Sequence, residues 1–174
     1  MQTTRSPIKY RASGFLGDDL VDLPLYRKYV ERVGTVLRAC EFATDLRRQN
    51  FVTSAGLVSL NLEVVFNDES SLLLSESFVV PSSMGSLNFT SKKITYQYMD
   101  KDGALIFRID CHGSYVPMEA PLHLDLPLRK HILDGDPILK GIEVSNADFS
   151  KIYGWICDRL AGEPLPWEDT DAKA

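Results

Sequence analysis

Several absences in the sequence narrow the class of protein before any motif is considered. No apolar run approaches the roughly 18 residues that a membrane-spanning helix needs, and no cationic segment followed by an apolar run marks a signal peptide. Cysteine is scarce: Cys40, Cys111 and Cys157 are far apart and form no CxxC pair, which argues against a disulfide framework and a thiolate zinc site. We therefore expect a cytoplasmic protein with buried, reduced cysteines and no membrane partner.

The motifs of several common enzyme classes are also missing. The chain has no Gly-rich phosphate loop of the Walker or Rossmann type, no GxSxG nucleophile elbow and no HExxH metal motif. Use of ATP or NAD and a Ser-His-Asp mechanism are therefore disfavoured. The sequence predicts no cofactor and no metal site.

Acidic side chains outnumber basic ones, but not evenly along the chain. The net charge is −5, yet residues 1–50 hold nine Lys and Arg against six Asp and Glu, while residues 51–174 hold ten against eighteen. A basic amino-terminal surface can meet phosphate, and Arg27, Lys28 and Arg32 are its candidate RNA-binding residues. The alternative is that these side chains form the ordinary solvated face of a helix.

Hydrophobic periodicity predicts an α+β fold. At 174 residues with 44% hydrophobic content, the chain can bury one core. Three-four spacing predicts helices over residues 22–49 and 145–161, and alternation between them predicts a mostly antiparallel sheet of four to five strands. We expect an irregular arm over residues 1–20, a single domain over 21–162 and an acidic, disordered tail over 163–174.

The first predicted hairpin has a defined register. Residues 57–66 and 72–80 both alternate, and their apolar sets share the core face only if Leu62 lies opposite Leu74 and Leu60 opposite Glu76. A slip of one residue would expose one set. Glu76 is therefore expected to point into the apolar face, tied to a Tyr hydroxyl or an Arg, or else to take part in chemistry.

The second predicted hairpin, ITYQYMDKDGALIFRIDCH, carries polar residues on its reverse face. We expect it to turn at DKDG with Met99 opposite Ala104. If the stretch PLHLDLP pairs nearby, five charged or titratable side chains converge: Arg108, Asp110, His112, His123 and Asp125. The alternative is that Arg108 and Asp110 form an ordinary surface ion pair.

Those residue types suit acid–base chemistry without a metal. Imidazole transfers protons near neutral pH, a guanidinium stabilises charge that develops on a phosphate, and carboxylates orient both groups. Cleavage of RNA requires these roles, because the 2′-hydroxyl of the substrate is the nucleophile.

Four stretches occur in a particular order between about residues 57 and 133: LLLSESFVV, ITYQYMDKDG, ALIFRIDCH and APLHLDL. They supply an acidic strand residue, a tyrosine strand, an Arg-x-Asp strand and a Pro-x-His stretch, and this order resembles the TumE family of toxins from bacterial toxin–antitoxin modules. The chain departs from that family at Cys111, where the family has Asn, and in its fewer histidines. The resemblance implies that five residues are functional positions: Glu76, Tyr96, Arg108, Asp110 and His123.

The resemblance implies a growth-inhibiting protein that cleaves or binds RNA without a metal and is neutralised by an antitoxin. The expected catalytic residues are Arg108, Asp110, His112, His123 and Glu76, with Tyr96 as a further RNA contact. The alternative is a non-catalytic interaction protein, such as a phage or mobile-element inhibitor that binds a larger complex through an acidic surface. The net charge of −5 favours that alternative.

Overall fold

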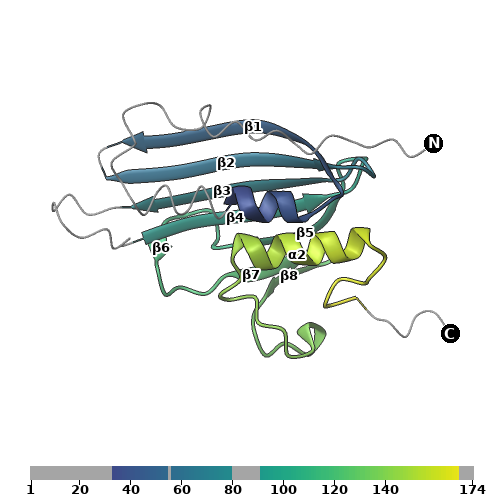
Figure 1. The fold of residues 1–174 in the computed structure, drawn as a ribbon. Helices are drawn as coiled ribbons and strands as arrows, with labels where there is room; N and C mark the ends of the chain where they lie inside the picture. The colour runs from purple at the N-terminus through teal and green to yellow at the C-terminus, as the bar shows by residue number, and fades with distance from the viewer. Residues whose placement is uncertain (1–32, 55, 80–90, 169–174) are drawn as a thin grey trace.

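The computed structural model describes residues 33–54, 56–79 and 91–168, which form one antiparallel sheet with helices on one face (Figure 1). The strands are β1 (Ala43–Ser54), β2 (Leu57–Phe66), β3 (Ser71–Val79), β4 (Ser91–Met99), β5 (Leu105–Asp110), β6 (Val116–Pro117), β7 (His123–Leu126) and β8 (Arg129–Ile132). Residues 33–39 are helical, η3 (Pro137–Leu139) is a 3-10 turn and α2 (Phe149–Leu160) is the carboxyl-terminal helix. The predicted α+β class is confirmed.

The sheet is larger than predicted. The described residues form eight strands rather than four or five, in the order β1-β2-β3-β4-β5-β7-β8, with β6 paired to β4. Strands that follow each other along the chain are mostly neighbours in the sheet. β6 and β8 were missed because segments of two and four residues are too short to show alternation.

The predicted amino-terminal helix extends too far. Helical structure ends at residue 39, and β1 begins at Ala43 and pairs with β2. Arg47 and Arg48, expected on the helix, lie on this strand, and the register shifts between Arg47 and Asn50. Pairing with β2 therefore overrides the local three-four spacing. The expected arm and the candidate RNA-binding residues Arg27, Lys28 and Arg32 lie outside the described residues.

One predicted hairpin register is right and the other is wrong. Leu62 lies opposite Leu74 and Leu60 opposite Glu76, as the alternation required. In the β4–β5 hairpin, however, Met99 pairs with Leu105 rather than Ala104, and an irregularity follows at the next pair. The Asp100 carboxylate accepts hydrogen bonds from the backbone N–H groups of residues 102 and 104, which widens the turn and shifts the partners along β5.

Apolar side chains fill the space between the sheet and the helices. α2 begins after Asp148, whose side chain accepts a hydrogen bond from the Lys151 N–H, and its apolar stripe contacts the sheet. The completely or almost completely buried side chains of this interface include Leu72, Tyr98, Phe107, Ile109, Ile152 and Ile156. None of the described helices is both long and apolar enough to cross a membrane.

The prediction of three reduced cysteines is wrong. Cys40 and Cys157 form a disulfide, with their Cα atoms 5.9 Å apart, and only Cys111 is a buried free thiol among the described residues. The bridge ties the end of the 33–39 helix to α2. A separation of 117 residues hid this pair, because it exists only after the two helices pack on the same sheet face.

The prediction of a disordered tail from residue 163 onward is wrong for its first part. Leu165 and Trp167 are 1% and 6% exposed. The Trp167 ring packs edge-on against Phe107 at a centroid distance of 5.1 Å. Residues 163–168 therefore belong to the core, and residues 169–174 lie outside the described part of the chain.

Truncation of the central core aromatic tests this packing. Phe107→Ala removes a side chain with 0% exposure and should lower the free energy of unfolding by about 3–5 kcal/mol. Leu128→Ala, at a fully exposed apolar position, is the matched control and should change it by less than about 0.5 kcal/mol. Urea denaturation measures both, and equal effects would place Phe107 outside the core.

Candidate functional site

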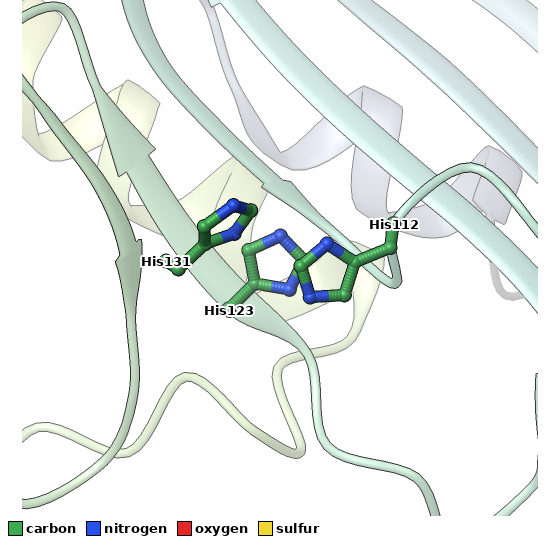
Figure 2. Close-up of side chains that lie close together, drawn as sticks. All are labelled: His112, His123 and His131. Carbon is green, nitrogen blue, oxygen red and sulfur yellow. The ribbon is translucent and has the colours of Figure 1, made fainter.

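The chain has three histidines, and the fold brings all of them together (Figure 2). His112 follows β5, His123 begins β7 and His131 lies in β8. Each offers one ring nitrogen, and the three nitrogens lie within 4.8 Å of one another. The ring centroids are 3.8 Å apart for His112 and His123, 4.5 Å for His112 and His131, and 5.0 Å for His123 and His131.

Two buried aspartates lie beside these imidazoles and share one arginine. Arg108 Nε is 2.5 Å from Asp110 Oδ2, and Arg108 Nη2 is 3.5 Å from Asp125 Oδ2. The two carboxylates are only 3% and 5% exposed, whereas the Arg108 side chain is 39% exposed. A buried carboxylate is costly without a compensating charge, so this is not the ordinary surface ion pair that was the alternative for Arg108 and Asp110.

The second oxygen of each aspartate holds the backbone of a histidine. Asp110 Oδ1 accepts a hydrogen bond from the His112 N–H at 3.0 Å, and Asp125 Oδ1 accepts one from the His131 N–H at 2.8 Å. His112 and His131 have φ angles of 64° and 57°, in the left-handed region. That conformation costs on the order of 1–3 kcal/mol for a residue other than glycine. The carboxylates therefore stabilise a strained backbone that turns both imidazoles toward His123.

His123 is the buried member of the trio, with 2% exposure. Its Nε2 lies 2.7 Å from Asp110 Oδ1, but neither this contact nor the Arg108 Nε contact has the alignment of a hydrogen bond. Burial lowers the pKa of His123, and His112 and His131 lower it further, against the opposing effect of Asp110 and Asp125. The imidazole is therefore neutral at neutral pH.

The structure brings together four of the predicted catalytic residues and adds one that was missed. Pairing of β5 with β7 places Asp110 opposite His123 and Arg108 opposite Asp125. We use "His–Asp–Arg cluster" for the set Arg108, Asp110, His112, His123, Asp125 and His131. His131 escaped the sequence analysis because β8 reads RKHI, without alternation; its residue type was the only signal.

Glu76 and Tyr96 do not belong to the His–Asp–Arg cluster. Both alternate with the apolar residues of β3 and β4 on the face toward the helices, whereas Asp110 and His123 lie on the opposite face. Tyr96 is 1% exposed, so it is not an RNA contact, and its hydroxyl donates a hydrogen bond to Glu76 Oε1. The tie to a Tyr hydroxyl, one of the alternatives for Glu76, is therefore what the structure shows.

The buried position of Glu76 changes its titration. Burial raises its pKa to about 7, the hydrogen bond from Tyr96 acts in the opposite direction, and the charge of Asp148 adds to the rise. Glu76 Oε2 has no hydrogen-bond partner among the described residues. The neutral acid is therefore favoured in the folded protein below about pH 7.

Comparison with protein-family models, curated proteins and solved structures finds no match to this chain. The resemblance to the TumE family therefore stays a prediction that rests on the four sequence stretches. The geometry bears on it in one respect: Arg108, Asp110 and His123, which carry the resemblance, are neighbours in space.

The pKa of Glu76 leads to a test by pH. Because the folded pKa lies above the usual 4.5, the wild type loses stability as pH rises from about 4.5 to beyond 7, whereas a glutamine cannot titrate. At about 1.36 kcal/mol per pKa unit, Glu76→Gln should gain up to about 3 kcal/mol relative to the wild type between pH 4.5 and 8. Glu163→Gln, at an exposed position, is the control and should show no such trend. Thermal and urea melts at several pH values measure the difference, and a flat profile for Glu76→Gln would contradict the burial.

Proposed function

We propose that the His–Asp–Arg cluster cleaves the phosphodiester backbone of RNA. The observation that carries the proposal is the convergence of every histidine of the chain beside two aspartates that share one arginine. The cluster consists of imidazoles, carboxylates and a guanidinium, and its two carboxylates are buried beneath the rest. A substrate that supplies its own nucleophile suits this set, and the 2′-hydroxyl of RNA is such a group.

The exposed side chains of the cluster can contact a large substrate. His112 and His131 are exposed and the Arg108 side chain is 39% exposed, while His123 and both aspartates are buried. The guanidinium can approach the non-bridging oxygens of a phosphate, where charge develops during cleavage. Asp110 and Asp125 hold that guanidinium in place rather than meeting the substrate.

A row of polar side chains crosses the sheet toward the cluster. Cross-strand pairing places Asn61, Ser75, Thr95, Asp110 and His123 side by side on the face away from the helices. Ser75 Oγ donates a hydrogen bond to Asn61 Oδ1 at 2.7 Å, and Thr95 is only partly buried. Hydroxyl and amide groups commonly contact the sugar and phosphate of nucleic acids without reading the base sequence. The row thus supplies a surface for a single strand that leads to the cluster.

The toxin role and the antitoxin partner are part of the proposal. Unrestrained cleavage of RNA would slow growth of the producing cell, so a neutralising partner protein is expected. The TumE-like order of motifs supports this role. The competing interaction protein would bind through an acidic surface, and in the described residues one acidic side chain near the carboxyl end, Glu168, is already paired: its carboxylate forms an ion pair with Arg159 and accepts a hydrogen bond from the Leu165 N–H.

Incubation of the purified protein with single-stranded RNA tests the proposal. Cleavage should leave 2′,3′-cyclic phosphate ends and should fail on a 2′-O-methyl RNA of the same sequence. Arg108→Ala should lower the rate on the order of 10²–10³-fold, because a positive charge at the developing oxyanion is lost. His131→Ala, at a 61% exposed side chain, should also lose activity while keeping the fold.

Arg47→Ala is the matched control, because Arg47 forms an exposed ion pair with Asp45 on the distant strand β1. It should leave the rate unchanged. Circular dichroism should show that each variant is folded. If the wild-type protein cleaves no RNA at any concentration of salt or divalent ion, the proposed function is wrong. The alternative of a non-catalytic interaction protein is then favoured.

A further inference from the structure

We infer that His112, His123 and His131 bind one divalent transition-metal ion. The sequence predicted no metal, and this inference rests on the geometry of the three imidazoles. Only the part that concerns RNA, namely that cleavage requires the ion, rests on the proposed function. Because both involve the same cluster, binding of the metal and cleavage of RNA are tested separately below.

The spacing of the rings disagrees with a metal-free acid–base mechanism. In an in-line displacement, a base and an acid lie on opposite sides of the phosphorus, and with hydrogen bonds of about 2.8 Å and an attack distance of about 3 Å their nitrogens are roughly 8 Å apart. The three ring centroids are 3.8–5.0 Å apart. No two of these imidazoles leave room for a phosphate between them in this arrangement.

The same spacing suits a shared ligand at the centre. The three ring nitrogens lie within 4.8 Å of one another, and Figure 2 shows the three rings close together. The His112 and His123 rings are stacked with 23° between their planes, so binding of one ion also requires the His112 ring to turn out of this stack. Nitrogens bound to Zn²⁺ at 2.0–2.1 Å in a tetrahedral site are about 3.4 Å apart, so the ligands need to close by up to about 1.4 Å. His112 and His131 are exposed, and rotation of their side chains can supply that movement while buried His123 stays in place.

The groups behind the imidazoles match the surroundings of a metal site. Histidine ligands usually direct their second nitrogen to a carboxylate, which fixes the orientation of the ring. Asp110 Oδ1 lies 2.7 Å from His123 Nε2, without the alignment of a hydrogen bond, and this position leaves Nδ1 of that ring for an ion. Asp125 Oδ1 lies 3.9 Å from His131 Nδ1, beyond hydrogen-bond distance, so the exposed His131 ring has to rotate before this carboxylate can orient it.

Acidic groups outnumber basic ones around the three imidazoles. The buried carboxylates of Asp110 and Asp125 share one arginine, Arg108. A bound divalent ion would add positive charge to this group of side chains, and positive charge attracts an anionic substrate such as RNA.

The ligand chemistry limits the identity of the ion. Imidazole nitrogen suits zinc, cobalt, nickel, copper and iron, whereas magnesium and calcium prefer oxygen ligands. Three protein ligands leave at least one coordination position for water or a substrate oxygen, as in catalytic zinc sites. When bound, such an ion supplies Lewis-acid stabilisation of a phosphate oxygen or activates the attacking hydroxyl.

A titration with Co²⁺ tests the inference. The protein carries no tag, and it is first stripped of metal with EDTA and dialysed. One Co²⁺ per chain should bind, with visible d–d absorption bands of a tetrahedral or five-coordinate nitrogen site, and Zn²⁺ should displace it. His131→Ala and His112→Ala, both at exposed positions, should each weaken binding by more than about 100-fold, because loss of a ligand exceeds the 10–100-fold effect of a supporting group. Bound ion should also raise the melting temperature of the wild type but not of the variants.

Tyr115→Ala is the matched control, since Tyr115 is an exposed aromatic residue near His112 that supplies no ligand. Its Co²⁺ affinity and absorption spectrum should equal those of the wild type. Absence of Co²⁺ binding at 100-fold molar excess over protein, or equal affinity in the wild type and the His112→Ala/His131→Ala double variant, would overturn the inference.

RNA cleavage then separates the two proposals. EDTA-stripped protein should be inactive and should regain activity with Zn²⁺ or Co²⁺ in proportion to the bound ion. If the ion binds through the histidines but RNA is never cleaved, the metal site stands and the proposed function falls. If stripped protein, verified to be metal-free, cleaves RNA at the full rate, the proposed function stands and the role of the ion in cleavage is overturned.

Discussion

The site depends on a single shared ion pair, in which Arg108 contacts two buried aspartates on neighbouring strands. One arginine cannot neutralise both Asp110 and Asp125, so their remaining oxygens bind other donors. Those donors are the backbone N–H groups of His112 and His131, which the carboxylates stabilise in left-handed conformations. Because the two buried carboxylates need hydrogen-bond donors, they bind the backbone N–H groups of His112 and His131. This binding places the two imidazoles at the surface.

The alternation of each strand separates two kinds of polar group. On β3 and β4, Glu76 and Tyr96 point toward the helices, bond to each other and contribute to the core. On β5 and β7, Asp110 and His123 point to the other face, where the third histidine arrives from β8. Glu76 and Tyr96 therefore have surroundings unrelated to those of Asp110 and His123, although all four were predicted as functional residues. The reason is that side chains at successive strand positions face opposite sides of the sheet.

Two elements of the fold give the cluster a rigid base. The apolar face beneath β5 and β7 is covered by α2, and Trp167 closes one side of the core against Phe107. The disulfide between Cys40 and Cys157 joins the 33–39 helix to α2 on that same face. The opposite face carries the polar row and the cluster and is covered by no helix among the described residues (Figure 1). The exposed side chains of His112 and His131 belong to this part of the cluster, away from the core.

By itself, the sequence determined the features that depend on near neighbours, namely the α+β class and the Leu62–Leu74 register. It predicted the convergence of Arg108, Asp110, His112 and His123 only on the condition that residues 121–127 pair with the Arg-x-Asp strand, which the pairing of β5 with β7 fulfils. It could not reveal features that depend on distant pairing. β1 replaced part of a predicted helix because β2 offered hydrogen bonds, Cys40 met Cys157 across two packed helices, and His131 joined the cluster only when β8 folded back on β7. Tertiary structure decided these three features because the partners that stabilise them lie far away in the sequence. The hydrophobic periodicity of a strand or a helix reports only on neighbouring residues and carries no information about such partners.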